Sequence, residues 1–285
     1  MTRRHLLAIV ALAAAFLAVY GAIFAGLVAQ WRHDENYSHG FLVVPFAAFV
    51  AWTRRDALQR APLTPTLGGL ALFAISLVIL TAGKLGAELF LARLSLIGVL
   101  AGSIAFVRGR AHLRILAFPL AFLVFMIPLP AIVFNQLTFP LQLFASTIGE
   151  AVIRGVGIPV LREGNVLQLP RRTLEVAEAC SGIRSLTSLM MFAVVLGHFT
   201  EHRAATRVLI ALAAIPIAIV ANAMRVAGTG IASEWISPAA ADGFLHMFSG
   251  LVMFVTALIG LLAVQRFAGR FAVSVSRRSV VGGRS

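Results

Sequence analysis

Three short segments of the sequence carry the side chains that a cysteine-based acyl-transfer enzyme needs. Cys180, the only cysteine in the chain, lies in the segment Glu178-Ala-Cys-Ser-Gly-Ile-Arg184. Arg225 interrupts an apolar stretch, and His246 begins another. A cysteine paired with a histidine gives an activated nucleophile and a general acid/base, and an arginine can stabilise an oxyanion. Together the three residues predict cleavage or transfer at a peptide bond.

Each of these residues also has a simpler interpretation when it is taken alone. A lone cysteine is usually a small buried hydrophobe. An arginine near a helix end often extends along the helix to the membrane surface, and a lone histidine is often an ordinary interface residue. One cysteine excludes an intramolecular disulfide and argues against a cysteine-based metal cage. The interpretation therefore depends on where the three residues lie in the fold.

The composition is that of an integral membrane protein. Hydrophobic residues make up 60% of the chain, charged residues only 12%, and the mean hydropathy is +0.93. A soluble domain carries about twice this share of charge. The formal net charge is +13, but the basic residues separate apolar runs, which is the arrangement of membrane topology signals. We therefore expect membrane lipid, and no nucleic acid, as a partner.

The apolar runs predict an all-α fold, a polytopic bundle of about eight transmembrane helices. The first run follows Arg3 and Arg4 and is too long for a signal peptide, so we expect it to remain as the first helix. The predicted spans cover residues 6–30, 41–53, 67–83, 87–107, 115–129, 182–198, 207–228 and 246–266.

Basic residues in the connections predict the orientation of the bundle. With the N-terminus inside, the inner connections hold most of the 24 Lys and Arg residues, and Asp56 and Glu201 alone of the 11 acidic ones. Both termini are then cytoplasmic. The basic residues of the connections alone predict this orientation, and it places all three candidate residues at outer helix ends.

Cys180 falls at the predicted start of the sixth helix, where free N–H groups and the helix dipole favour a thiolate. Ser181 and Gly182 keep the backbone open beside the sulfur, and Arg184 adds positive potential one turn later. Arg225 lies near the outer end of the seventh helix, with Asn222 one turn earlier on the same face.

The longest interruption between spans, residues 130–181, falls outside. Phe134 to Val152 is apolar but contains polar residues and a proline, and we expect an outer interfacial or re-entrant helix. A ninth span is the alternative, which would invert every later loop. Val160 to Leu169 contains Gly164-Asn165 between β-branched segments and predicts a short β-hairpin just before the cysteine-bearing helix.

A second outer polar segment, Arg32 to Gly40, contains Tyr37, Ser38 and His39. These side chains are candidates for substrate contact or for loop structure. Two histidines and two acids in one loop are a weak metal signal, and the sequence predicts neither a metal nor another cofactor.

The three segments and their order closely resemble the exosortase/archaeosortase family. Glu178 to Leu186 is the most specific match, followed by Asn222-Ala-Met-Arg225 and His246-Met-Phe-Ser-Gly250, and Tyr37 to Val43 is similar to that family's first outer loop. The resemblance covers roughly residues 20 to 265. We expect a single transmembrane domain over residues 1–268, followed by a basic cytoplasmic tail over 269–285 without the additional C-terminal domain of some members.

The resemblance implies a multi-pass inner-membrane cysteine protease or transpeptidase with its active site facing the periplasm. Cys180 would be the nucleophile, His246 the acid/base and Arg225 the oxyanion stabiliser. Supporting or substrate-binding roles would fall to the polar residues around them: Glu178, Ser181, Gly182, Arg184, Asn222, Tyr37, Ser38 and His39. Substrates would be exported proteins with a C-terminal motif such as Pro-Glu-Pro, a transmembrane helix and a basic tail. An association with exopolysaccharide export is a further expectation.

Two non-enzymatic functions remain as alternatives, a small transporter and an assembly factor for envelope polysaccharide. A transporter would carry ionisable residues near the middle of the membrane. Arg93 and Glu88 are the candidates for that role, whereas the other functional groups gather at outer helix ends. Substitution of Cys180 would stop an enzyme and leave either alternative unaffected.

Overall fold

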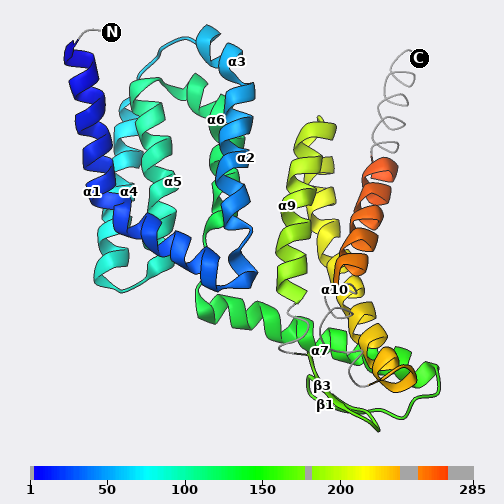
Figure 1. Ribbon diagram of the computed structural model, residues 1–285. Coiled ribbons are helices and arrows are strands. Elements are labelled where there is room, and N and C mark those ends of the chain that lie inside the picture. Colours follow the sequence, from blue (N-terminus) through cyan, green and yellow to red (C-terminus); the bar gives the residue numbers. More distant parts are fainter. Residues whose placement is uncertain (1–2, 177–181, 238–249, 269–285) are drawn as a thin grey trace, which may run out of the picture. The chain divides into compact units, whose positions relative to one another are not determined.

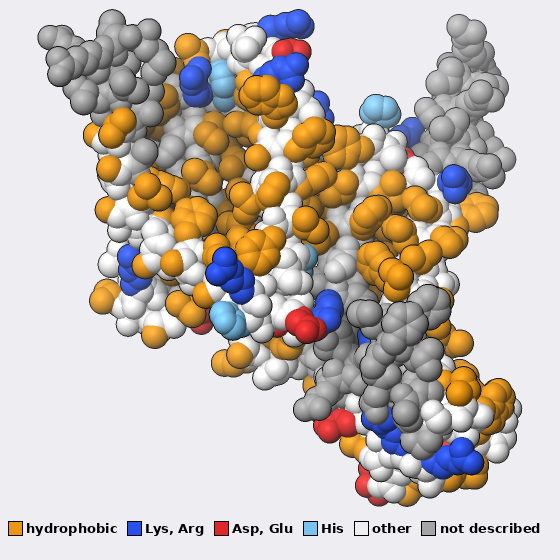
Figure 2. Space-filling view, viewed as in Figure 1, with side chains coloured by type: hydrophobic (Ala, Val, Ile, Leu, Met, Phe, Trp, Pro, Cys, Tyr) orange, Lys and Arg blue, Asp and Glu red, His pale blue; other side chains and the backbone are white. Residues whose placement is uncertain are grey.

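The computed structural model describes residues 3–176, 182–237 and 250–268. Helices dominate, as the sequence predicted, and six of those described are long and apolar enough to cross a membrane. These six helices cover Ala14–His33, Leu67–Leu85, Leu89–Val107, Ala131–Gly155, Ala204–Trp235 and Gly250–Ala268. Hydrophobic side chains cover the sides of the helices, and most charged side chains lie near helix ends (Figure 2). The chain is a multi-pass membrane protein.

The chain divides into two compact units, residues 1–131 and 132–285. Six helices build the first unit (Figure 1): α1 (Arg3–His33), α2 (Gly40–Thr53), α3 (Arg55–Arg60), α4 (Leu67–Leu85), α5 (Leu89–Val107) and α6 (Arg110–Phe122). The predicted spans at 41–53 and 115–129 correspond to two of the shorter helices. The first is α2, and the second is α6 continued by the 3-10 helix η2 (Leu123–Met126).

Glycines let α4 and α5 pack at very short range. A Cβ on Gly102 of α5 would lie 2.5 Å from the backbone nitrogen of Phe73 and 2.8 Å from its Cα. Small residues at such crossings allow backbones to approach closely, which is a main source of helix association in lipid. Buried hydrogen bonding adds to this packing, since the Tyr20 hydroxyl lies 3.1 Å from the Ser95 hydroxyl of α5.

The second unit contains α7 (Ala131–Gly155), a small sheet, α9 (Gly182–Thr200), α10 (Ala204–Trp235) and a last helix over Gly250–Ala268. α7 runs across the ends of α9 and α10 in Figure 1. Several of its apolar side chains are exposed, among them Ile132, Leu137 and Phe144. Its crosswise direction supports the expected interfacial position, although its length and composition would also suit a span.

The predicted hairpin is confirmed and extended by a third strand. Strands β1 (Leu161–Glu163), β2 (Val166–Gln168) and β3 (Thr173–Glu175) form an antiparallel sheet in that order. Gly164 begins the β1–β2 turn with a φ of +65°, a conformation that favours glycine and that type II′ hairpin turns need at this position.

Two hydrophobic clusters form the core of the second unit, and α10 contributes to both. Ala223, Val226 and Ala227 pack with α7 and with the sheet, including the fully buried Leu167. The other cluster joins α9, α10 and the last helix through Leu189, Ala193, Ile210, Ala214, Ala218, Ala257 and Leu261. α10 therefore fixes the sheet and the helical bundle of this unit relative to each other.

Candidate functional site

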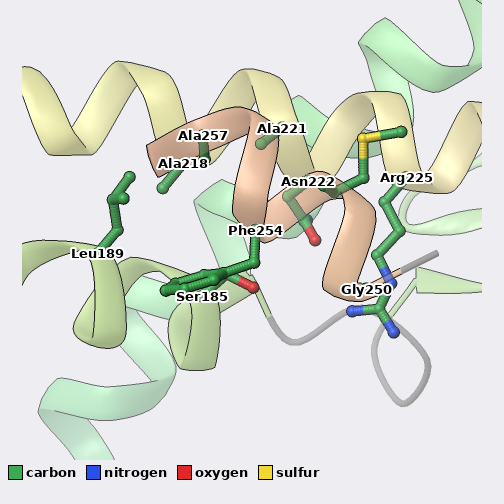
Figure 3. A pocket seen from close by; sticks show the side chains of 10 residues that line it. Ser185, Leu189, Ala218, Ala221, Asn222, Arg225, Gly250, Phe254 and Ala257 are labelled. Atoms are coloured by element: carbon green, nitrogen blue, oxygen red, sulfur yellow. The ribbon is translucent and has the colours of Figure 1, made fainter. Parts of the chain in front are cut away.

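A pocket opens between α9, α10 and the last helix (Figure 3). Each of the three candidate segments lies within one of these helices or directly before it in the sequence, and all three helices line the pocket. The lining residues are Ser185 and Leu189 of α9, Ala218, Ala221, Asn222 and Arg225 of α10, and Gly250, Met253, Phe254 and Ala257 of the last helix. The pocket therefore unites two of the predicted site residues, Asn222 and Arg225.

Small side chains on α10 explain how the three helices come together. Ile210, Ala214 and Ala218 recur every four residues and are at most 3% exposed. This spacing keeps them on one face of the helix. Because alanine side chains are short, α9 and the last helix can approach this face closely. Asn222 and Arg225, farther along the helix, enter the pocket.

The Arg225 guanidinium faces Gly250 of the last helix. A Cβ on Gly250 would stand 3.5 Å from the guanidinium carbon and 3.6 Å from Nη2, which is ordinary van der Waals distance. Figure 3 shows this guanidinium beside Gly250, and the Asn222 amide in the same pocket. Asn222 is 6% exposed, so a charged donor and an amide lie together in a largely enclosed space.

α7 and β3, the strand that precedes the cysteine segment, pack on the other face of α10. The ideal Cβ of Gly149 on α7 would touch Val226 Cγ1 at 3.0 Å, and that of Gly230 on α10 would meet Ile153 Cδ1 at 2.7 Å. α7 and α10 thus cross at glycines. Leu174 of β3 packs into the same cluster, so the strand just before residues 177–181 is anchored on α10.

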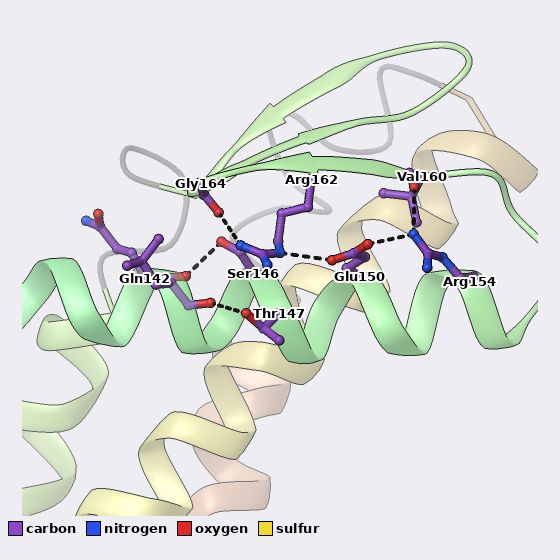
Figure 4. Close-up of polar contacts among 9 residues, drawn as sticks. Gln142, Ser146, Thr147, Glu150, Arg154, Val160, Arg162 and Gly164 are labelled. Carbon is purple, nitrogen blue, oxygen red and sulfur yellow. Dashed lines mark hydrogen bonds and ion pairs between the residues drawn. The ribbon is translucent and has the colours of Figure 1, made fainter.

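A carboxylate on α7 holds the sheet (Figure 4). Glu150 accepts a hydrogen bond from Arg154 Nη2 at 2.6 Å and another from Arg162 Nε of β1 at 2.9 Å. Arg162 also donates to the Gly164 carbonyl at 3.1 Å. The Arg162 side chain is 30% exposed, whereas that of Arg154 is 65% exposed, so the bond to the sheet is the better shielded of the two.

A second contact fixes the turn between β2 and β3 to the end of α10. Glu234 accepts a hydrogen bond from the backbone N–H of Arg171 at 2.9 Å, and its own carbonyl accepts one from the Arg171 guanidinium at 3.1 Å. The sheet is thus held by a charged residue at both ends, on α7 and on α10.

Several predicted residues lie outside those that the structure describes: Glu178, Cys180, Ser181 and His246. Gly182 is the first residue of α9, as the sequence predicted for this segment. Arg184 lies exposed in the first turn of α9. The approach of Cys180, Arg225 and His246 to one another therefore stays a prediction.

Tyr37, Ser38 and His39, between α1 and α2, belong to the first unit, where they contact their own chain. The Tyr37 hydroxyl accepts a hydrogen bond from the backbone N–H of Leu129 at 3.3 Å. His39 Nε2 lies 3.0 Å from the Phe125 carbonyl oxygen, and Ser38 donates to the Glu35 carbonyl at 3.0 Å. Tyr37 and His39 thus fix the backbone that follows α6.

Burial changes the acidity of two of these side chains. It raises the pKa of Tyr37 above its ordinary value, so the phenol stays neutral. It lowers the pKa of His39, against the opposing effect of the Phe125 and Asn36 backbone groups. A neutral His39 with its proton on Nε2 donates to the Phe125 carbonyl.

Four features of the pocket and of the first unit had no role assigned from the sequence. Ser185 and the alanines that line the pocket were given no function, and Gly250 was considered only as part of a motif. Trp31 was also overlooked, although its indole N–H donates to the Met126 carbonyl at 3.0 Å beside the Tyr37 and His39 contacts. A tryptophan near the end of a predicted helix was the available signal, because its indole N–H usually has a partner when it is buried.

The candidate residues for a transporter have different surroundings. Arg93 is 6% exposed within α5, with the Tyr37 phenol within electrostatic range. Glu88 accepts a hydrogen bond from the Phe90 backbone N–H at 3.1 Å and so caps α5. Within the described part of the chain, no three His, Cys, Asp or Glu side chains gather closely enough to hold a metal ion.

Comparison with known proteins gives one family match. A family model described as transmembrane exosortase matches residues 31–263, well over half of the chain. No curated protein matches, and no solved structure matches. The matched range contains all three candidate segments and the Tyr37–His39 segment.

Proposed function

The chain belongs to the transmembrane exosortase family and so has a membrane transpeptidase-like role, and from this premise we propose that it is a cysteine peptidase or transpeptidase. Its substrates would be exported proteins whose C-terminal sorting signal has a motif of the Pro-Glu-Pro type, a transmembrane helix and a basic tail. The peptide bond would be cut at the outer face of the inner membrane, with both termini of the enzyme in the cytoplasm.

The observation that carries the proposal is the pocket shared by α9, α10 and the last helix, with Arg225 against Gly250. Cys180 stands two residues before Gly182, so peptide geometry keeps the two Cα atoms within about 8 Å. His246 stands four residues before Gly250, which limits that Cα separation to about 15 Å. Both limits allow the thiol and the imidazole to reach a substrate held at Arg225.

The length of α10 supports a position for this site near the surface of the hydrocarbon layer. About 20 helical residues cross the hydrocarbon, whereas α10 has 32. Counted from the basic end at Arg203 and Arg207, those 20 residues finish close to Arg225. The remaining turns then lie beyond the hydrocarbon, where they meet the sheet and α7. A cut at this level would separate an exported domain from its own membrane helix.

The proposed chemistry assigns one step to each side chain. His246 takes the proton of the Cys180 thiol, and the thiolate attacks the scissile carbonyl carbon. Arg225 donates hydrogen bonds to the oxyanion that forms. As the C–N bond breaks, His246 returns the proton to the leaving amine. The thioester that remains is then resolved by water or by an amine.

The test is cleavage of a reporter that carries such a sorting signal, measured as a size shift in membranes containing the full-length enzyme. We expect Cys180→Ala to abolish cleavage. Arg225→Lys keeps the charge but loses the planar fork of donors, and we expect it to lower the rate by about 100-fold or more. Arg207→Lys, at the other end of α10, is the matched control and should cleave normally.

Because the chain has one cysteine, labelling with a small maleimide shows whether an inactive Arg225 variant keeps an accessible thiol. Cleavage that persists in Cys180→Ala would refute the cysteine mechanism. It would favour a role as transporter or as assembly factor for envelope polysaccharide, in which the cysteine has no function. An association with exopolysaccharide export would be tested separately by co-purification.

A further inference from the structure

Six arginines lie at one end of the first unit, on two connections that the fold brings together. One connection includes α3 and leads from α2 to α4, and the other is the turn from α5 to α6 with the start of α6. All six side chains are exposed: Arg54, Arg55, Arg60, Arg108, Arg110 and Arg114. The sequence has one acid, Asp56, within residues 54–67 and 105–114. Figure 2 shows basic side chains gathered at the end of this unit where Figure 1 places α3.

Backbone contacts hold the two connections against each other. The N–H of Thr64, after α3, donates to the Arg108 carbonyl at 3.3 Å. Gly109 has a φ of +96°, and any Cβ at this position would collide with the Thr64 carbonyl. The Arg110 guanidinium reaches the start of α4, where Nη2 lies 4.0 Å from the ideal Cβ of Gly68. The positive charges of the two connections therefore share one surface.

Little of this charge is neutralised by the protein itself. Arg55 lies 3.7 Å from Asp56, but both side chains are more than half exposed, so the pair is weak. Within the part of the chain that the structure describes, the other five arginines form no salt bridge. Like charges held at one surface repel each other. An anion bound there would relieve this repulsion in addition to forming its own hydrogen bonds.

Exposed apolar side chains lie at the same end of the unit. Trp52, Leu63 and Leu67 are 66%, 62% and 79% exposed, and all three lie within or next to the connection that includes α3. The Arg55 guanidinium is 5.3 Å from the centre of the Trp52 ring. Tryptophan is enriched where the hydrocarbon of a bilayer meets the headgroups. Groups that suit a phosphate and groups that suit an acyl chain are therefore adjacent.

We infer that this surface, formed by the six arginines with Trp52, Leu63 and Leu67, binds anionic phospholipid. Guanidinium groups donate paired hydrogen bonds to phosphate oxygens, and the apolar side chains would contact the acyl chains. A soluble phosphate would use the arginines and leave the apolar side chains without a role. A zwitterionic lipid brings a positive charge of its own and gains less from this surface. The inference does not depend on the proposed chemistry.

Trp52 allows the binding to be measured at the surface itself. The full-length protein in an uncharged detergent would be titrated with phosphatidylglycerol whose acyl chains carry bromine, which quenches the fluorescence of nearby tryptophans. The Trp52 signal is the difference between the natural protein and Trp52→Phe. We expect half-maximal quenching at about a 10-fold lower mole fraction of phosphatidylglycerol than of phosphatidylcholine with the same chains, because each arginine near anionic lipid contributes up to about 5-fold.

Three further variants separate this surface from the overall charge of the protein. Arg60→Gln combined with Arg110→Gln removes one charge from each connection and should reduce the preference for phosphatidylglycerol to about 2-fold. Arg32→Gln combined with Lys84→Gln is the matched control. It removes the same charge at exposed positions near the other end of the unit and should keep the full preference. Asp56→Asn removes the acid within the surface and should raise the preference several-fold.

Equal binding of the two lipids by the natural protein would overturn the inference, and so would a preference that both double variants lose. Excess inorganic phosphate would be compared with chloride at equal ionic strength, since salt alone screens exposed charges. If phosphate abolishes the preference and chloride does not, the surface binds a soluble anion and the lipid assignment is wrong. If the variant of Arg60 and Arg110 does not fold, Asp56→Asn decides, and an unchanged preference rejects the surface.

Discussion

The Arg225 guanidinium faces Gly250 across a gap that a Cβ would fill at ordinary van der Waals distance. A Cβ at Gly250 would meet Cζ at 3.5 Å, Nη2 at 3.6 Å and Nε at 3.8 Å. The missing side chain at Gly250 therefore leaves room beside the guanidinium. The glycine that ends the histidine segment thus has a defined neighbour on α10.

Two substitutions at Gly250 should distinguish a harmless contact with the Arg225 guanidinium from displacement of that group. Gly250→Ala places one methyl group at van der Waals distance, and we expect reporter cleavage within about 3-fold of normal. Gly250→Val adds branches that push the guanidinium out of position, and we expect a loss of about 100-fold, comparable with the removal of an oxyanion donor. Equal activity of the two variants in the cleavage assay would show that the position of Arg225 does not matter.

Glu150 should control how firmly the sheet is held on α7. Glu150→Gln removes the charge that Arg154 and Arg162 share, and we expect the attachment to weaken by about 1 kcal/mol, since the pair is only partly buried. The measurement is amide hydrogen exchange over residues 160–176. Glu163→Gln is the matched control, because Glu163 bonds only to the exposed Gln168 within the described sheet. Faster exchange in both variants would contradict a specific role for Glu150.

Alanine substitution should affect stability differently at a glycine within the α4–α5 contact and at a glycine with open space around it. Gly102→Ala puts a Cβ 2.5 Å from the Phe73 nitrogen, so the helices must separate, at a cost of about 1–3 kcal/mol. At Gly21 of α1 nothing lies within 4 Å of the ideal Cβ. There the same substitution should be neutral or stabilise by roughly 0.5–1 kcal/mol. Thermal unfolding in detergent compares them, and equal midpoints would argue against this packing.

His39 should make the stability of the first unit depend on pH. Burial lowers its pKa in the folded protein, so the unfolded chain binds the proton more readily. Stability is then complete above the unfolded pKa of about 6.5 and falls as the pH drops below it. His39→Gln removes the titration but keeps an N–H donor. We expect its unfolding midpoint to fall less than that of the natural protein between pH 7 and pH 5, and identical slopes would exclude this role.

Much of the fold could be predicted because its signals are local. Apolar runs gave the helices, and Gly164-Asn165 between β-branched residues gave the hairpin. The third strand, Thr173–Glu175, was missed because three residues carry no periodic pattern. The orientation of α7 depends on Gly149 and Gly230, whose contacts with the facing helix no single segment reveals.

The candidate site was predictable in part for the same reason. Arg225 and Asn222 stood out as polar residues in an apolar helix, and the structure brings them to one pocket. Ala218 and Ala257 did not, because an alanine that faces lipid and one that lines a pocket look alike in sequence. The partners of Tyr37 and His39 are backbone groups about 90 residues away, so sequence alone left substrate contact and loop structure equally open.

The length of α10 links the proposed site to the thickness of the surrounding bilayer. Each residue of the helix adds about 1.5 Å, so a hydrocarbon layer about 3 Å thicker covers two more residues of α10. Arg225 is near the level where the hydrocarbon would end, and even this change would submerge it. Lipid composition would then act as a control on turnover, with thin membranes exposing the guanidinium and thick ones withdrawing it from water.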